Sequence, residues 1–191
     1  KGVDPYEILT KSASHVEPGS EGLIFLPYLM GERTPHGDAN AKAVFFGLTL
    51  RHKKEHLIRA VMEGVTYGMR DSLEIIKNLG LNVGQIRATG GGARSPLWRQ
   101  MQADIYNAEV VTINIAEGPA FGAAILAGVG TGIYDSIEQA TDSVIAITSL
   151  TRPIPDNKKI YDEYYKIYRS LYPALKPEFD KVSELVAKFT A

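Results

Sequence analysis

Residues 85–115 read QIRATGGGARSPLWRQMQADIYNAEVVTINI, and in this stretch a strand pattern changes to a helix pattern and back again. Three glycines form a sharp turn after the first strand, and Ser95 and Pro96 fit the N-cap and the first residue of the helix. The expected elements are a strand at 85–89, a helix at 97–107 and a strand at 109–115. A strand, a helix and a strand joined by short turns predict an α/β architecture with crossover connections.

The same alternation extends in both directions along the chain. Asp4 and Pro5 begin a helix that continues to Val16, and Asp156 begins another helix after two prolines. The other expected strands are residues 23–27 and 44–50, and the other expected helices are residues 53–79, 119–130, from 135 or 136 to 145, and 178–189. A polar stretch without periodicity predicts a long surface loop at 28–43.

Three helical segments carry features that predict close packing. The helix at 53–79 contains Gly64 and Gly68. Each glycine costs about 1 kcal/mol relative to alanine, so another backbone is expected to lie against it. Small residues in the helix at 119–130 predict tight packing on the sheet, and tyrosine and aliphatic rows in the helix from Asp156 predict that it covers the domain. The small residues of the helix at 119–130 are Gly122, Ala123 and Ala124. The rows of the helix from Asp156 are made of Ile160, Tyr161, Tyr164, Tyr165, Ile167, Tyr168, Leu171 and Tyr172.

Composition excludes several classes of protein. The 191 residues contain 21 Lys and Arg against 22 Asp and Glu, so the net charge of -1 provides no field for nucleic acid. No apolar run approaches the roughly 20 residues of a membrane span, and the absence of cysteine excludes disulfides and thiol nucleophiles. We expect a cytoplasmic protein. Because the chain opens with Lys1 rather than Met, we also expect it to be a piece of something longer.

The glycine turn at 90–92 is the strongest candidate for a ligand site. Three glycines remove every side chain from one backbone surface, and the following helix offers free N–H groups to an anion. The alternative is that this strand-to-helix turn uses glycine for steric reasons alone. The turn is not a dinucleotide fingerprint, because Ser95 replaces the third required glycine, and the chain has no phosphate loop of the Gly-Lys-Ser/Thr type.

Other polar residues give weaker signals. Glu117 and Gly118 could form the rim of a ligand cleft. Glu32 and Arg33 could face a cleft, but we expect them to pair with each other and fix the shape of their loop. His52 and His56 are four residues apart but have no third ligand nearby, so a solvated surface is expected rather than a metal site. We find no candidate catalytic base and no acidic pair arranged for Mg²⁺.

Taken together, the motifs of the chain resemble those of the FGGY carbohydrate kinases. The resemblance rests on GERTPH at 31–36, AKAVFFGLT at 41–49, HLIRAVMEG at 56–64, GGGARS at 90–95, LWRQMQAD at 97–104 and EGPAFGAA at 117–124. These motifs cover nearly the whole chain, in the order of the family. The resemblance implies an actin-like ATPase domain of the ribonuclease H type, with a mixed sheet flanked by helices.

The resemblance also implies a role for the glycine turn. In family members this loop lines the nucleotide side of a cleft, so Gly91, Gly92 and Ala93 would contact ATP through their backbone. Ser95 and Pro96 occupy the stretch near the base, where the family often carries a polar residue and where Pro96 offers no N–H. The expected cofactors are ATP and Mg²⁺, with the metal held mainly by the phosphates and by another domain.

Family members have two domains, and the first supplies the catalytic Asp, most sugar contacts and a further phosphate loop. None of those motifs occurs here, so residues 1–191 are expected to be the nucleotide-binding C-terminal domain, inactive by itself. The implied reaction transfers the γ-phosphate of ATP to a sugar hydroxyl. D-xylulose is the expected sugar, and gluconate, glycerol or another polyol are alternatives.

A further alternative is a stand-alone nucleotide-binding module without catalysis. The expected partners are ATP and a sugar bound mainly by the first domain. Neither nucleic acid nor a membrane is expected as a partner, and a homodimer is left open.

Overall fold

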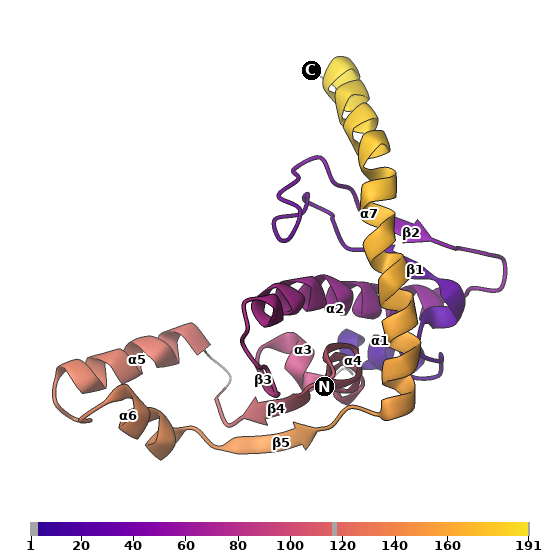
Figure 1. The fold of residues 1–191 in the computed structure, drawn as a ribbon. Coiled ribbons are helices and arrows are strands. Elements are labelled where there is room, and N and C mark those ends of the chain that lie inside the picture. Colours follow the sequence, from indigo (N-terminus) through magenta and orange to yellow (C-terminus); the bar gives the residue numbers. More distant parts are fainter. Residues whose placement is uncertain (1–3, 116–117, 191) are drawn as a thin grey trace.

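The computed structural model describes residues 4–115 and 118–190, which form a mixed α/β fold (Figure 1). The helices are α1 (Pro5–Ala13), the 3-10 helix η1 (Ser20–Gly22), α2 (Lys54–Asn78), α3 (Gly91–Arg94), α4 (Pro96–Tyr106), α5 (Gly118–Gly130), α6 (Ile137–Val144) and α7 (Pro155–Thr190). The strands are β1 (Ile24–Leu26), β2 (Val44–Phe46), β3 (Gln85–Ala88), β4 (Glu109–Ile113) and β5 (Ile147–Thr151). No helix in the described ranges combines the length and apolar character of a membrane span.

The main sheet has the order β3-β4-β5 and is mixed. Strand β3 pairs with β4 in parallel, with Gln85 opposite Glu109, and β4 pairs with β5 antiparallel, with Val110 opposite Thr151. The sequence predicted β3 and β4 but not β5. A separate antiparallel pair joins β1 and β2, with Ile24 opposite Phe46. Strand β2 ends at Phe46, so the predicted strand at 44–50 is too long.

Helix α2 lies against β1, and Gly64 makes this approach possible. A Cβ at Gly64 would lie 2.1 Å from the carbonyl oxygen of Phe25, whereas a Cβ at Gly68 would lie 3.3 Å from the Tyr168 hydroxyl oxygen. The predicted close approach of another backbone is therefore confirmed at Gly64. At Gly68 the neighbour is a side chain.

A buried ion pair within α2 binds the segment after α1. The Arg59 Nε donates to Glu63 Oε1 at 2.8 Å, and the Tyr161 hydroxyl donates to the same oxygen at 3.0 Å. Glu63 also accepts from the Gly19 N–H and the Ser20 hydroxyl, at 3.0 and 2.8 Å. Burial raises the pKa of Glu63, and the neighbouring Arg59 guanidinium opposes that shift. This carboxylate holds a turn in which four consecutive residues have positive φ angles, from Gly19 to Gly22.

Helix α7 differs from its prediction in two ways. It is a single helix of 36 residues that contains Pro173 and Pro177, so the separate closing helix expected at 178–189 is wrong. Its two predicted apolar rows also differ in how deeply they are buried. The tyrosine row is buried, whereas Ile160 and Ile167 are 40 % and 44 % exposed. The tyrosines therefore cover the domain, as predicted, while part of the aliphatic row faces outward.

The long loop at 28–43 lies on α7. The Tyr172 hydroxyl donates to Asp38 at 2.8 Å, the Asn40 amide donates to Asp180 at 3.2 Å, and the His36 ring stacks on Tyr172 with 3.6 Å between centroids. Glu32 accepts from the backbone N–H of Thr34 at 2.7 Å. In the described structure Glu32 fixes the loop through that main-chain contact, and the predicted pairing with Arg33 is wrong.

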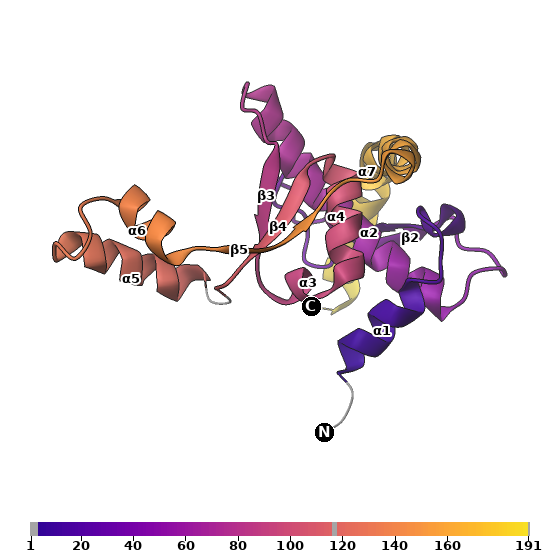
Figure 2. The ribbon, with the colours of Figure 1, turned by 90° about the horizontal axis from the view of Figure 1, so that it is seen from below.

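Two further expectations are corrected by the structure. Helix α5 packs on α6, and the two project away from the rest of the molecule (Figures 1 and 2). The expected packing of this helix on the sheet is therefore wrong, because Ala123 and Ala124 are exposed and a Cβ at Gly122 would meet nothing within 4 Å.

His56 is only 8 % exposed and accepts from the Lys53 N–H at 3.1 Å, so it is not the solvated residue we expected.

Candidate nucleotide site

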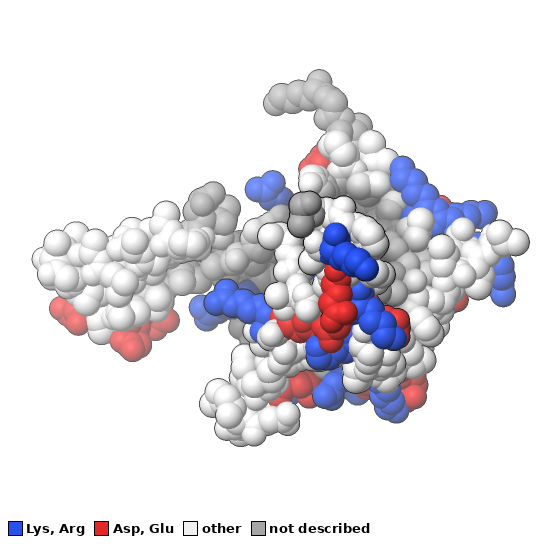
Figure 3. Space-filling view, turned by 90° about the horizontal axis from the view of Figure 1, so that it is seen from above, with Lys and Arg blue, Asp and Glu red and all other residues white. Residues whose placement is uncertain are grey.

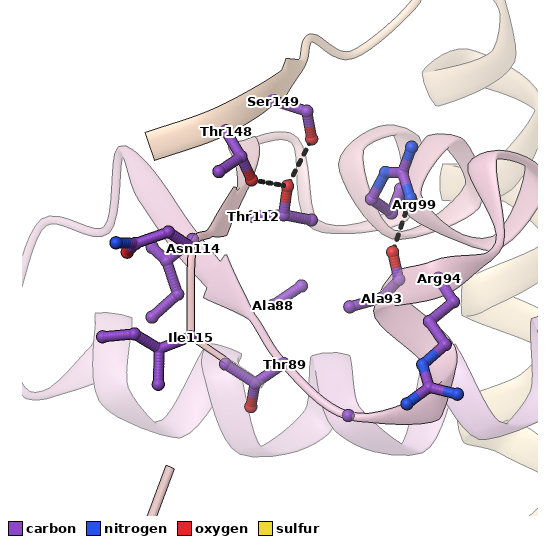
Figure 4. Close-up of a pocket in the computed structure, with 12 residues that line it drawn as sticks. Ala88, Thr89, Ala93, Arg94, Arg99, Thr112, Asn114, Ile115, Thr148 and Ser149 are labelled. Atoms are coloured by element: carbon purple, nitrogen blue, oxygen red, sulfur yellow. Dashed lines mark hydrogen bonds between the residues drawn. The ribbon is translucent and has the colours of Figure 1, made fainter. Parts of the chain in front are cut away.

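A cavity of about 450 Å³ lies at the carboxyl ends of the parallel strands β3 and β4 (Figure 4). Its lining residues come from the strand ends, the glycine turn, α3, α4 and β5. They are Ala88, Thr89, Gly90, Ala93, Arg94, Arg99, Thr112, Ile113, Asn114, Ile115, Thr148 and Ser149. In α/β sheets the carboxyl ends of parallel strands are the usual place for ligands, so the topology and the cavity point to the same site.

The glycine turn forms one wall of this cavity. Gly90 has φ 77° and ψ -163°, a conformation that essentially requires glycine. An added Cβ at Gly90 or Gly91 would meet nothing within 4 Å. A Cβ at Gly92 would instead lie 3.3 Å from Trp98 Cε3, so the missing side chain of Gly92 leaves room for the indole ring. The main chain at Gly90 and Gly91 is therefore open to a ligand.

Two arginines add positive charge to the same wall. The Arg99 guanidinium donates to the carbonyl oxygen of Ala93, which ties α4 to the end of the glycine turn. Arg94 is exposed at the edge of the cavity and extends from the glycine turn in the close-up view (Figure 4). A guanidinium beside open backbone suits an anionic group such as a phosphate.

The opposite wall is made of hydroxyl and amide groups from β4 and β5. Thr112 Oγ1 lies 2.9 Å from Thr148 Oγ1 and 2.6 Å from Ser149 Oγ. The Asn114 side chain ties the end of β4 to the segment between α6 and β5, because it donates to the Val144 carbonyl at 3.0 Å and accepts from the Ala146 N–H at 2.9 Å. These groups give the cavity a neutral polar side facing the arginines.

The five predicted cofactor-binding residues occupy two different places. Gly91, Gly92 and Ala93 lie in α3, and of these three only Ala93 lines the cavity. Ser95 and Pro96 begin α4 as predicted, and the Ser95 hydroxyl caps that helix by accepting from the Trp98 N–H at 3.3 Å. They do not line the cavity.

Several lining residues were missed by sequence reasoning. Arg94 stood inside the motif that we singled out, but Thr112 and Asn114 lie at the end of the next strand, and Thr148 and Ser149 belong to the strand that was not predicted. The parallel pairing of β3 and β4 was the signal that could have identified Thr112 and Asn114. Gly118 is exposed at the start of α5 and does not line the cavity, whereas Glu117 lies outside the described residues.

The lining residues include no Asp, Glu or His, so the cavity offers no general base and no carboxylate ligand for a divalent cation. Nor does any group of three or more such side chains that could hold a metal occur within residues 4–115 and 118–190. Backbone, guanidinium and hydroxyl groups can bind and orient an anionic ligand. A cation there would be coordinated by the ligand's own oxygens.

Residues 5–131 match the model of the C-terminal domain of the FGGY family of carbohydrate kinases. The chain is 42 % identical over 170 residues to a xylulose kinase of Staphylococcus epidermidis, covering 89 % of this chain and 34 % of that protein. It is also 42 % identical over 184 residues to a gluconokinase of Bacillus subtilis, covering 96 % of this chain and 36 % of that protein.

The crystal structure of ligand-bound xylulose kinase from Lactobacillus acidophilus superposes with a TM-score of 0.86 at 31 % identity. The superposition covers 92 % of this chain and 36 % of that one. The chain therefore spans about a third of the length of the relatives that it matches.

Proposed function

The chain belongs to the FGGY family of carbohydrate kinases, within the C-terminal domain of that family, and on this premise we propose that it is the ATP-binding half of a sugar kinase. The fold expected from the sequence, an actin-like ATPase domain with a mixed sheet flanked by helices, is confirmed. The complete enzyme would transfer the γ-phosphate of ATP to a sugar hydroxyl.

The observation that carries the proposal is the cavity where the open backbone of Gly90 lies beside Arg94. ATP would supply the phosphoryl group and bring Mg²⁺ with its phosphates. The residues of this chain would hold the phosphates by backbone N–H groups and by Arg94, and orient the nucleotide against the hydroxyl wall of Thr112, Thr148 and Ser149. Gly91, Gly92 and Ala93 remain the proposed backbone contacts.

Catalysis would need a second half. Phosphoryl transfer depends on positioning and on charge stabilisation, and the cavity has no base that could accept a proton from a sugar hydroxyl. We therefore propose that the sugar and the base are supplied by polypeptide that the longer relatives carry outside the matched third. The two halves would close on each other before the reaction.

D-xylulose is the sugar that we propose, and gluconate is a second candidate. Xylulose kinases recur among the relatives, but the gluconokinase of Bacillus subtilis shares the same 42 % identity as the first xylulose kinase. The cytoplasmic location stays a prediction, and a homodimer stays open.

Calorimetry and a coupled kinase assay test the proposal. We expect the isolated 191 residues to bind Mg-ATP and to produce no sugar-dependent ADP. Sugar-dependent ADP production by these residues alone would contradict the division between two halves, and the absence of ATP binding would contradict the site. A panel of D-xylulose, gluconate and glycerol, assayed with the enzyme that contains this chain, decides the sugar.

A further inference from the structure

One face of α7 carries an unbroken apolar pattern along the helix. Nine apolar or tyrosine side chains follow one another at alternating spacings of four and three residues, which is the pattern of a helix that packs along its whole length. We call this set the α7 seam: Tyr161, Tyr165, Tyr168, Tyr172, Leu175, Phe179, Val182, Val186 and Phe189. At 36 residues, α7 is about 54 Å long, and the seam occupies most of it.

The cover of the seam changes abruptly after Phe179. The four tyrosines pack in the core of the domain, and Phe179 is 5 % exposed in the same core as Ala41 of the long loop. Among the hydrogen bonds between that loop and α7 in the described residues, the one from Asn40 to Asp180 lies furthest along the helix. Beyond it, Val182 is 47 %, Val186 is 52 % and Phe189 is 73 % exposed. Leu185, next to the seam, is 54 % exposed.

The other side of this helix end carries charged residues, so its apolar and charged side chains lie on different sides of the helix. Lys181 donates to Glu178 at 2.7 Å, and Glu184 and Lys188 continue the polar side. Figure 3 looks down on this end of the molecule, where blue and red side chains lie next to one another near the centre of the view. A helix with one apolar and one charged side is built to be covered on its apolar side.

The exposed part of the seam could be covered by a second molecule of this chain or by a partner joined to the same polypeptide, and its size distinguishes the two. A stable dimer of two separate molecules buries about 1,200–2,000 Å² in total, and four side chains on fewer than three turns of helix provide only a small part of that area. A partner joined to the same polypeptide needs much less, because tethering raises its effective concentration to about the millimolar range. The relatives have such polypeptide, since the match covers 34 % to 36 % of their length.

We propose that Val182, Leu185, Val186 and Phe189 dock on an apolar surface of the companion half of the kinase. This inference rests on the proposed function, because that function is what supplies a companion half. Helix α7 would then contact both halves, the ATP-binding body through its tyrosines and the companion through the exposed end of the seam. The position of one half relative to the other would be set partly by this helix.

The experiment uses two separate polypeptides. One is the 191-residue chain, and the other is the portion of the Staphylococcus epidermidis xylulose kinase that lies outside its match to this chain. The companion is added at up to about 1 mM, the effective concentration that a tether provides. Backbone hydrogen exchange at 182–190 and the dissociation constant of the pair are measured under these conditions for the unchanged chain, for Val186→Asp and for Ala187→Asp. Both variants add one carboxylate to the same exposed turn, but only Val186 belongs to the seam.

We expect the chain alone to be monomeric and to exchange rapidly at 182–190, and the companion to slow that exchange at least tenfold. Val186→Asp should weaken the complex at least tenfold, whereas Ala187→Asp should change it less than threefold. Three results would each overturn the proposal: no complex, a complex that leaves 182–190 unprotected, or a dimer of this chain that Val186→Asp dissociates. ATP binding is measured on the same samples by titration. The candidate nucleotide cavity does not include this end of α7, so a failure of ATP binding and a failure of docking can be told apart.

Discussion

The indole N–H of Trp98 donates to Thr66 Oγ1 at 3.0 Å, and this contact fixes the first turn of α4 on the long helix α2. The same indole ring occupies the space beside Gly92, where an added Cβ would lie 3.3 Å from Cε3. Thr66 has no exposed surface and in turn donates to the Met62 carbonyl at 2.7 Å. The glycine turn therefore takes its position from α2 through a single aromatic side chain.

Replacing Gly92 with Val should weaken ATP binding at least tenfold, which corresponds to about 1.4 kcal/mol. The branched side chain meets the Trp98 ring, so either the ring or the turn must move, and the proposed phosphate contacts move with the turn. Calorimetry measures the affinity, and circular dichroism should show an intact fold with a modestly lower Tm. Gly84→Val is the control, because a Cβ there meets nothing within 4 Å. Unchanged affinity in a folded Gly92→Val protein would remove the turn from the site.

Arg94→Gln should also weaken ATP binding, by about three- to tenfold, because a charge-assisted hydrogen bond to phosphate is lost. The effect should shrink as the salt concentration rises, since Arg94 is exposed. Arg87→Gln removes an equally exposed arginine from the strand before the turn, outside the cavity, and should leave affinity within twofold. Equal losses in the two variants would indicate a general charge effect rather than a contact.

Local signals in the sequence were sufficient for most helices and for the position of the glycine turn. Asp4, Ser95 and Ser136 accept hydrogen bonds from the backbone of the helices that they cap, as the cap residues predicted. Each of these contacts lies within three residues along the chain. Such short-range physics can be inferred without knowing the rest of the fold.

Contacts between distant segments account for what the sequence did not predict. Strand β5 has little apolar alternation of its own and forms because β4 pairs with it. A separate helix was expected at 178–189, yet α7 continues across Pro173 and Pro177, where Tyr172 and Phe179 are buried on either side. Thr148 and Ser149 of the hydroxyl wall lie in β5, so they could not be predicted as site residues without predicting that strand.

The two glycines of α2 should respond differently to alanine. Alanine gains about 1 kcal/mol in a helix interior, but at Gly64 its Cβ would lie 2.1 Å from the Phe25 carbonyl oxygen, so β1 must shift. We expect Gly64→Ala to lower the free energy of unfolding by about 2–3 kcal/mol, the upper part of the usual range of about 1–3 kcal/mol for overpacking. Gly68→Ala meets only the Tyr168 hydroxyl at 3.3 Å and should stay within about 1 kcal/mol. Urea denaturation measures both, and equal effects would contradict the close approach at Gly64.

Removing the buried carboxylate of Glu63 should cost about 3–5 kcal/mol of unfolding free energy, because Arg59 would be left as an uncompensated charge. Glu63→Ala also removes the acceptor of the Gly19 N–H and the Ser20 hydroxyl. Glu163→Ala breaks an exposed pair with Lys166 and should cost less than about 1 kcal/mol. The same small loss in both variants, measured by urea denaturation, would show that the buried pair does not hold the turn.

His36 should make stability depend on pH below neutrality. Burial lowers the pKa of His36 from 6.5, against the raising effect of Asp71 and Asp38 and with a smaller lowering by Arg169. As the pH falls through 6.5, the unfolded chain takes up a proton that the folded protein binds less readily, so stability is lost toward acid. Above pH 6.5 this contribution is constant.

The substitution His36→Phe isolates this effect, because phenylalanine keeps a ring against Tyr172 but has no proton to exchange. Melting temperatures between about pH 5 and 8 should fall more steeply toward acid for the unchanged chain than for His36→Phe. If His36→Phe retains the full acid slope, the proton responsible is bound elsewhere, and the stacking of His36 on Tyr172 has no part in the pH response of the loop.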